Sequence, residues 1–427
     1  MYKNFNSNLN YLPRIINLIV ALFSIAFAVQ FINLSKGDLL NHYPYITPDG
    51  YEWYTNGVYF FYRLFEENLP QLTVLRPPTF VIFTGLDFLL GSSGYVLGCL
   101  FAFSTYYTYY FSLKIIEFST KTTNPNWALM TALALGVTIA PINYVKVYLL
   151  ADFLANTLAL GSIYFIIKFT NANLNRFYWL CILFSLLAGL TQSYTLLSYL
   201  LISLYICIYC GNVYRLNGIL KFSGLFFIPI IGYILLTYLW RNSVSYLMTP
   251  ENFTLLKFTT RNIEFYKVVW PVFIWVPCLI IIIRSAIIYR PFEIMHTLTI
   301  PLFITVLLLM TLSFFYQWQE SRFTYYVWPW LLILSLQLIS RFKSLLLFTS
   351  LALIISSFIV PKNYWEPKPK EIVLSTKNWI QQYFSAVPID RKLIKCEPGC
   401  PNNTWMADQN HHGTGKTLSI YLQLLDK

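Results

Sequence analysis

Two carboxylates and an arginine stand close together in the first polar connection of the chain. Asp49 and Glu52 are three residues apart. Arg76 lies further along the same connection, directly before two prolines. Residues three apart share one face of a helix, so a helical backbone would let the two carboxylates act together. A carboxylate can take a proton from a hydroxyl group, and a guanidinium binds phosphate through paired donors. These residue types therefore predict acid–base chemistry beside an anion.

Each of the three residues also has a structural interpretation. Asp49 lies in a Pro-Asp-Gly turn, where its side chain would cap the next helix, with Glu52 as a solvated neighbour. Arg76 is kept out of the helical region by Pro77 and could serve only as an anchor at a membrane interface. The interpretations overlap, because a capping carboxylate can also act as a base.

The composition indicates a protein embedded in a membrane. Of the 427 residues, 57% are hydrophobic and 11% are charged, whereas soluble domains carry about 25% charged residues. The net charge of +12 is scattered between apolar segments, which argues against the clustered basic face of a nucleic-acid-binding protein. The sequence therefore predicts an all-α polytopic membrane protein, with membrane lipid and no nucleic acid as its partner.

The apolar segments are long enough to cross a bilayer about eleven times, since a crossing needs about 17 to 25 residues. The predicted transmembrane helices are 15–34, 91–116, 127–142, 148–169, 177–194, 195–211, 219–240, 268–288, 294–315, 323–340 and 343–361. The stretch 78–90 is predicted to be either a re-entrant piece or the start of the second span. No small-residue cleavage site follows the first segment, so we expect it to remain as a span of a transmembrane domain over 1–361.

Lys and Arg in the connections predict the orientation. With a cytoplasmic N-terminus, every inside connection holds a basic pair, as the positive-inside rule requires. The pairs are Lys3 and Arg14, Lys114 and Lys121, Lys168 and Arg176, Arg215 and Lys221, Arg284 and Arg290, and Arg341 and Lys343. The long first loop 35–77 with its interfacial helices, the second loop 241–267 and the small tail 362–427 are then extracytoplasmic. We expect a multi-pass protein of the bacterial inner membrane.

Further polar residues fall on the same predicted outer face. Lys146 and Asp152 could contribute to a site or simply form a structural ion pair with each other. Glu320 and Arg322 open a late span, where the arginine could contact phosphate or anchor the helix. Arg261 belongs to a loop in which cations alternate with aromatic residues, a pattern that suits a lipid-linked anion and equally suits ordinary headgroups.

Two cysteines stand in the predicted outer tail. Cys396 and Cys400 enclose the sequence Glu-Pro-Gly, and an oxidising compartment favours a small disulfide loop between them. The alternative is half of a metal site with His411 and His412. We prefer the disulfide, because two adjacent histidines give poor ligand spacing.

The order of these features resembles the GT-C integral-membrane glycosyltransferases that use polyprenyl-phosphate-linked sugars, such as the protein mannosyltransferases and the lipid A aminoarabinose transferases. The resemblance covers roughly residues 10–360. Its elements are the acids Asp49 and Glu52, the segment Arg76-Pro77-Pro78, Asp152 at an outer helix start, and the run Glu320-Ser321-Arg322-Phe323. The chain departs from many relatives in the spacing of its first two acids and in having Gln192 where they have arginine.

The resemblance implies transfer of a sugar, with inversion, to a protein, lipid or glycan acceptor. It implies Asp49 as the base, with Glu52 as its substitute, and four phosphate contacts from Arg76, Lys146, Arg322 and Arg261. We expect no required cofactor, although some relatives bind a divalent cation through acids that correspond to Asp49, Glu52 and Asp152.

Two other functions fit the same layout. One is a transporter or flippase of a lipid-linked substrate, and the other is a polymerase or ligase of surface polysaccharide. Transporters usually place polar groups near the bilayer midplane and contain internal repeats. This chain has no evident repeat, and Asp87 is the exception to charges at span ends.

The topology predicts where the C-terminus lies. A reporter that is active only outside the cytoplasm should be active when it is fused after Lys427, because an odd number of crossings separates the two termini. A fusion within the first predicted inside connection is the control and should be inactive. A cytoplasmic signal from the C-terminal fusion would contradict the map.

Overall fold

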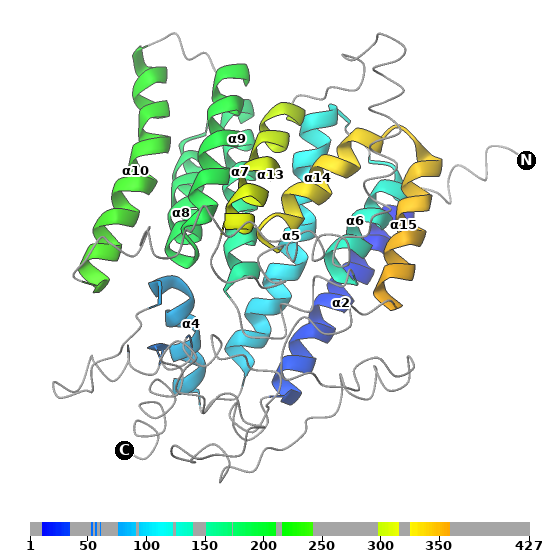
Figure 1. Ribbon diagram of the computed structural model, residues 1–427, viewed down its shortest axis with the longest axis horizontal. Coiled ribbons are helices and arrows are strands. Elements are labelled where there is room, and N and C mark those ends of the chain that lie inside the picture. The colour runs from blue at the N-terminus through cyan, green and yellow to red at the C-terminus, as the bar shows by residue number, and fades with distance from the viewer. Residues whose placement is uncertain are drawn as a thin grey trace, which may run out of the picture. The chain divides into compact units, whose positions relative to one another are not determined.

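A computed structural model describes the chain as a set of α-helices (Figure 1). It describes residues 11–34, 76–90, 94–122, 125–139, 151–172, 174–210, 216–241, 298–315 and 325–358, together with Trp53, Asn56, Gly57 and Phe60. These residues form eleven helices and no strand, so the all-α prediction is confirmed for the described part of the chain. The tail 362–427 lies outside it.

Every predicted span except 268–288, which lies outside the described residues, coincides with a helix. The helices are α2 (Leu12–Leu34), α4 (Pro78–Leu89), α5 (Tyr95–Thr120), α6 (Trp127–Thr138), α7 (Asp152–Ala172), α8 (Asn175–Thr191), α9 (Tyr194–Cys210), α10 (Leu216–Arg241), α13 (Thr299–Phe315), α14 (Trp328–Ile339) and α15 (Lys343–Phe358). Uniformly apolar segments with few internal breaks form helices readily, because all backbone groups inside a helix are hydrogen-bonded within it.

The stretch 78–90 is a helix of its own and not the beginning of the second predicted span. Helix α4 has 12 residues, which is about 18 Å and short of the roughly 30 Å of a bilayer core. Gly94 separates it from α5 with a φ of 73°, a conformation that glycine adopts without strain. The chain therefore turns between α4 and α5.

Asp87 explains why that turn is stable. Its Oδ2 accepts a hydrogen bond from the Gly94 N–H at 3.1 Å, and its Oδ1 accepts one from the Val96 N–H at 3.1 Å. The carboxylate is fully buried and satisfies amides at the start of α5, which a helix leaves without internal partners. The charge that interrupts this apolar stretch therefore has a structural role.

The chain divides into two compact units. Unit 1 comprises Met1–Ser24, Ser104–Asn143 and Ala155–Pro361, and unit 2 comprises Ile25–Phe103, Tyr144–Leu154 and Lys362–Lys427. Helices α2, α5 and α7 contribute residues to both units. Unit 2 contains α4, Arg76 and Asp152, whereas Gln192 belongs to unit 1.

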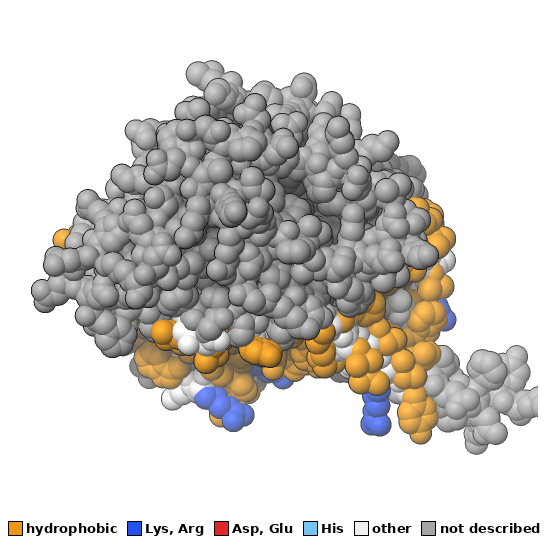
Figure 2. Space-filling view, turned by 90° about the horizontal axis from the view of Figure 1, so that it is seen from below, with side chains coloured by type: hydrophobic (Ala, Val, Ile, Leu, Met, Phe, Trp, Pro, Cys, Tyr) orange, Lys and Arg blue, Asp and Glu red, His pale blue; other side chains and the backbone are white. Residues whose placement is uncertain are grey.

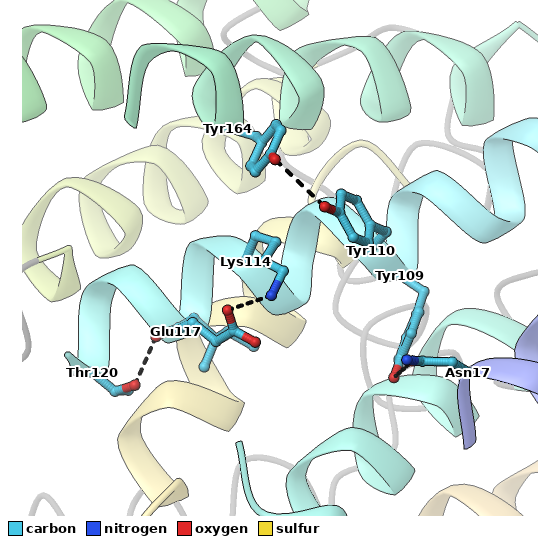
Figure 3. A network of polar contacts seen from close by, with 8 residues as sticks. Asn17, Tyr109, Tyr110, Lys114, Glu117, Thr120 and Tyr164 are labelled. Atoms are coloured by element: carbon cyan, nitrogen blue, oxygen red, sulfur yellow. Dashed lines mark hydrogen bonds and ion pairs between the residues drawn. The ribbon is translucent and has the colours of Figure 1, made fainter. Parts of the chain in front are cut away.

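Within unit 1, hydrogen bonds between polar side chains join the helices. The Thr108 and Thr157 hydroxyls lie 2.7 Å apart between α5 and α7, and the Tyr109 hydroxyl donates to Asn17 Oδ1 at 3.0 Å between α5 and α2 (Figure 3). Figure 1 shows α13 beside α14, and α6 beside α15, as their contacts require. Helix α14 is buried along its whole length, so it forms the centre of this packing.

The outer surfaces of several helices are strongly apolar. The described side chains visible in Figure 2 are mostly hydrophobic, with a few Lys and Arg side chains among them. On α10, large side chains such as Leu220, Phe227, Ile231 and Leu239 are about 60% exposed. Among the described residues, α7 and the segment Leu220–Trp240 of α10 are long and apolar enough to cross a membrane.

The capping role of Asp87 is testable by substitution. Asp87→Ala should lower the free energy of unfolding by about 1–3 kcal/mol, because it leaves two amide donors without their acceptor. Thermal unfolding of the purified protein in detergent measures the effect. Asp87→Asn retains one acceptor oxygen and should cost less, and equal stability of Asp87→Ala and the natural protein would contradict the assignment.

Candidate functional site

The structure describes three of the predicted site residues: Arg76, Asp152 and Gln192. The remaining predictions lie outside the described residues and stay predictions. They are Asp49, Glu52, Lys146, Arg261, Glu320 and Arg322, together with the cysteine pair Cys396 and Cys400. The site below is therefore built on Arg76 and Asp152, which belong to the same unit.

Neighbouring residues hold the backbone of Arg76 in place. Its N–H donates to Asn56 Oδ1 at 2.9 Å. The next residue is Pro77, and α4 then begins at Pro78, the first-turn position where proline is tolerated because its missing N–H has no partner in a helix. The two prolines and the Asn56 amide therefore hold the arginine at a defined point, just before the helix.

The guanidinium of Arg76 lies over an aromatic ring. Its central carbon is 5.5 Å from the ring centroid of Trp53, within the range of a cation–π interaction. Trp53 is 1% exposed, and its ring meets the edge of Phe80 at 5.3 Å and 83°. The tryptophan, which belongs to the loop 35–77 predicted to hold interfacial helices, is thus a buried platform for the arginine.

The Trp53 platform is anchored on α4. The Thr84 hydroxyl donates to the Trp53 carbonyl at 3.0 Å, and Gly57 packs so closely on Thr84 and Gly85 that a Cβ at this position would collide with them. Both contacts are made with adjacent residues of α4, Thr84 and Gly85. The short helix therefore positions the segment that carries Trp53 and Asn56, and through it the arginine.

Asp152 supplies the negative charge of the site. It is the first residue of α7 and is 3% exposed. Burial desolvates this side chain, and the positive charge of Arg76 acts on it in the opposite sense, as does the amino end of a helix, which stabilises an anion. Within the described part of the chain, Asp152 Oδ1 has no hydrogen-bond partner. The carboxylate therefore keeps one acceptor oxygen available.

Aromatic packing holds Asp152 beside the arginine segment. Phe153 stacks on Phe101 at 4.5 Å and meets the edge of Phe80 at 6.1 Å. Phe80 in turn contacts Trp53. A continuous set of rings therefore joins the start of α7 to the platform under Arg76. The described charge that acts on Asp152 is that of Arg76, and the predicted ion pair with Lys146 lies outside the described residues.

Gln192 has a local role. Its N–H donates to the Ala188 carbonyl at 2.8 Å, so that it ends α8. Its carbonyl accepts from the Thr195 N–H at 3.2 Å and from the Thr195 hydroxyl at 2.7 Å. These bonds form the tight connection between α8 and α9. The described contacts of Gln192 are those of a helix end.

A polar side chain also holds the segment that precedes α14, another helix that begins on the predicted outer face. Asn156, one turn into α7, donates from Nδ2 to the Tyr325 carbonyl at 3.0 Å. Tyr325 precedes α14 directly, and Tyr326 stacks on Tyr194 at 4.0 Å. Sequence reasoning singled out neither Trp53 as a platform nor Asn56 and Asn156 as anchors. A buried amide in an apolar segment is the signal that identifies such anchors.

The arrangement can bind an anion and accept a proton or a donor group. An arginine held on a tryptophan offers its fork of N–H groups to phosphate, and Asp152 offers an acceptor beside it. Of the acids named as an alternative metal set, only Asp152 is described. Among the described residues, no three His, Cys, Asp or Glu side chains gather closely enough to hold a metal ion.

Comparison with known proteins finds no relative whose function could be compared with this site. No protein-family model matches the chain, and no curated protein matches it. The functional argument therefore proceeds from Arg76, Asp152 and the arrangement of the helices.

Proposed function

We propose that the protein is an integral-membrane glycosyltransferase of the GT-C type, which moves a sugar from a polyprenyl-phosphate donor to an acceptor hydroxyl on the extracytoplasmic face. The observation that carries this proposal is the position of the Arg76 guanidinium over the buried Trp53 ring, in the same unit as the buried side chain of Asp152 on which its charge acts.

The apolar surface of α10 supports a place in the bilayer. Its segment Leu220–Trp240 is only 22% buried against the rest of the protein. A soluble protein does not leave a continuous apolar helix of this length in water, because contiguous exposed apolar surface of this size drives association. The hydrocarbon core of a bilayer removes that cost, because it keeps the apolar side chains out of water. Helix α7 is 78% buried and suits a central position among other spans.

Contacts between helix ends support the alternating topology. At the predicted outer ends, Asn156 contacts Tyr325, and the Trp328 indole donates to the Gly136 carbonyl at 3.0 Å. At the predicted inner ends, the Leu298 N–H donates to Ser119 Oγ at 3.1 Å. The ammonium of Lys343 lies 4.9 Å from the ring centroid of Trp127, and both residues begin helices on the predicted inner side. Each contact joins ends that the Lys and Arg pattern assigns to one side.

Sugar transfer from a lipid phosphate depends above all on a cation that binds the departing phosphate. Transfer breaks the bond between the anomeric carbon and the phosphate oxygen, and negative charge grows on the departing lipid phosphate. The Arg76 guanidinium meets that charge, and positioned cations of this kind stabilise a transition state strongly. The acceptor oxygen attacks the opposite face of the sugar, which inverts the anomeric carbon, and a carboxylate takes the hydroxyl proton.

Asp49 remains the proposed base, with Glu52 as its substitute. Lys146, Arg261 and Arg322 remain proposed phosphate contacts. Asp152 acts differently in this scheme. Because it is buried and faces Arg76, it positions the guanidinium and keeps it from turning into solvent. No cofactor is required in this scheme.

The transporter alternative is weakened by Asp87. This acid is the exception to the concentration of charges at span ends, and both of its oxygens accept backbone hydrogen bonds from Gly94 and Val96. A polymerase or ligase of surface polysaccharide would use the same donor chemistry with another acceptor. Transfer of labelled sugar from a polyprenyl-phosphate donor, compared with movement of the intact lipid across vesicles, distinguishes the enzyme from a flippase.

Replacement of Arg76 tests the phosphate contact. Arg76→Gln should lower kcat for sugar transfer by roughly 10²–10³-fold, as expected when one transition-state donor is lost. Arg76→Lys should retain part of the activity, since it keeps the charge without the forked donors. Arg14→Gln, which removes an exposed cation from α2, is the control and should be fully active. Unchanged kcat in Arg76→Gln would overturn the assignment.

The two proposed carboxylate roles give different outcomes. Asp49→Asn should abolish transfer while the protein stays folded and inserted, because an amide cannot take the proton of the acceptor hydroxyl. Asp152→Asn should lower kcat less than Arg76→Gln does, because Asp152 acts only by positioning the guanidinium that remains. Full activity of Asp49→Asn would remove Asp49 from the mechanism. A loss of transfer in Asp152→Asn as complete as that expected for Asp49→Asn would instead make Asp152 the base.

A further inference from the structure

Three exposed cations gather where α7 ends and where α8 and α10 begin. They are Lys168, Arg176 and Lys221. We propose that these residues and the aromatic side chains beneath them, here called the basic–aromatic surface, bind the headgroup of an anionic phospholipid. The inference rests on the proposed placement of the protein in a membrane, but not on sugar transfer.

Aromatic rings connect the cations into one surface. The Lys221 ammonium lies 5.9 Å from the ring centroid of Phe169, and Phe169 packs 5.5 Å from Tyr178 of α8. A side chain on Gly224 of α10 would collide with the Tyr178 hydroxyl. Residues from α7, α8 and α10 therefore pack together around Phe169, with the cation of α10 on top of them.

The other two cations lie on rings of the same surface. The Lys168 ammonium is 5.7 Å from the ring centroid of Tyr164, and the Arg176 guanidinium is 4.8 Å from that of Phe177. Phe177 stacks on Phe165 of α7 at 6.4 Å. Each cation is thus held against a ring while its N–H groups stay exposed. An exposed cation on an aromatic ring can still bind an anion on its other side.

Among the described residues, the acid whose charge reaches this surface is Glu117, which acts on Tyr164. Glu117 is already paired with Lys114 at 2.7 Å on α5 (Figure 3). The only acid in α7, α8 or α10 is Asp152, at the opposite end of α7. Helix α8 also begins without a side-chain cap, and its amino end adds positive potential at this point. The surface therefore favours an anion.

Apolar neighbours indicate that the anion carries hydrocarbon. Leu174 is 44% exposed, Trp179 is 59% exposed and Leu220 is 64% exposed, and they flank Arg176 and Lys221 in sequence. Tryptophan is common at the level of lipid headgroups. Basic surfaces between helices on the cytoplasmic side bind anionic headgroups, and an acyl chain would cover these three side chains. Free phosphate has no acyl chain and would not cover these side chains.

The experiment measures lipid binding to the full-length protein in detergent by native mass spectrometry. Phosphatidylglycerol and phosphatidylcholine are titrated separately, and millimolar inorganic phosphate is added in a third arm. The natural protein should bind phosphatidylglycerol at least about tenfold more tightly than phosphatidylcholine, since each cation near a headgroup strengthens binding severalfold. Inorganic phosphate should not displace the lipid. Equal binding of the two lipids, or displacement by phosphate, overturns the proposal.

Two triple variants locate the site. Lys168→Gln, Arg176→Gln and Lys221→Gln together should remove most of the preference for phosphatidylglycerol. Arg14→Gln, Lys121→Gln and Lys343→Gln together remove the same charge from the same predicted face and should leave the preference intact. Retention of the preference in the first variant, or an equal loss in the second, overturns the assignment.

A single variant and a parallel assay complete the test. If the first triple variant does not fold, Lys221→Gln alone should weaken phosphatidylglycerol binding about threefold with no change for phosphatidylcholine, and an unchanged affinity overturns the proposal. Sugar transfer is measured on the same samples. Loss of lipid preference with normal transfer, or the reverse, separates a failure of this inference from a failure of the proposed function.

Discussion

The cation–π contact between Arg76 and the buried Trp53 ring is the interaction on which the described part of unit 2 depends. Asn56 accepts from the Arg76 N–H, and the two prolines that follow restrict the backbone at this point. Trp53, Phe80 and Phe153 form a continuous set of rings that reaches the start of α7. Asp152 at that helix start is 3% exposed, and burying a carboxyl group is costly. The Arg76 charge that acts on it offsets part of that cost.

Unit 1 follows a different constraint, the satisfaction of polar groups among apolar helices. The described helices have few charges, so hydroxyl, amide and indole groups make the specific contacts between them. Thr108 meets Thr157, Asn156 holds the Tyr325 carbonyl, and the Trp328 indole donates to the Gly136 carbonyl. Such bonds are worth little each, but they fix which helix faces pack together, because apolar packing alone tolerates many registers.

The proposed basic–aromatic surface and the proposed catalytic site use arginine and aromatic rings in related ways. In both, a cation lies over an aromatic ring, Arg76 over Trp53 and Arg176 over Phe177. They differ in burial: Asp152 balances the half-buried Arg76, whereas Arg176 is exposed. One arrangement suits a reaction that develops charge in a confined place, and the other suits a resident lipid at a surface.

The helices were predictable because an apolar run of sufficient length has few alternatives to a helix, and every described predicted span is one. Two local features were not. Asp87 looked like a functional charge within an apolar segment, but its role as acceptor for Gly94 and Val96 depends on the direction in which the chain turns after α4. Trp53 suited a membrane interface by type alone, whereas its burial depends on Phe80 and Thr84.

The sequence by itself determined the helical class and the residue types from which a site could be built, because composition and apolar run length act locally along the chain. Only the tertiary structure decided which distant residues act on one another. Arg76 and Asp152 are separated by α4, α5 and α6 in sequence, yet the charge of the arginine acts on the acid. Partner choice between distant charges depends on how the intervening helices turn and pack, and no local pattern encodes that geometry.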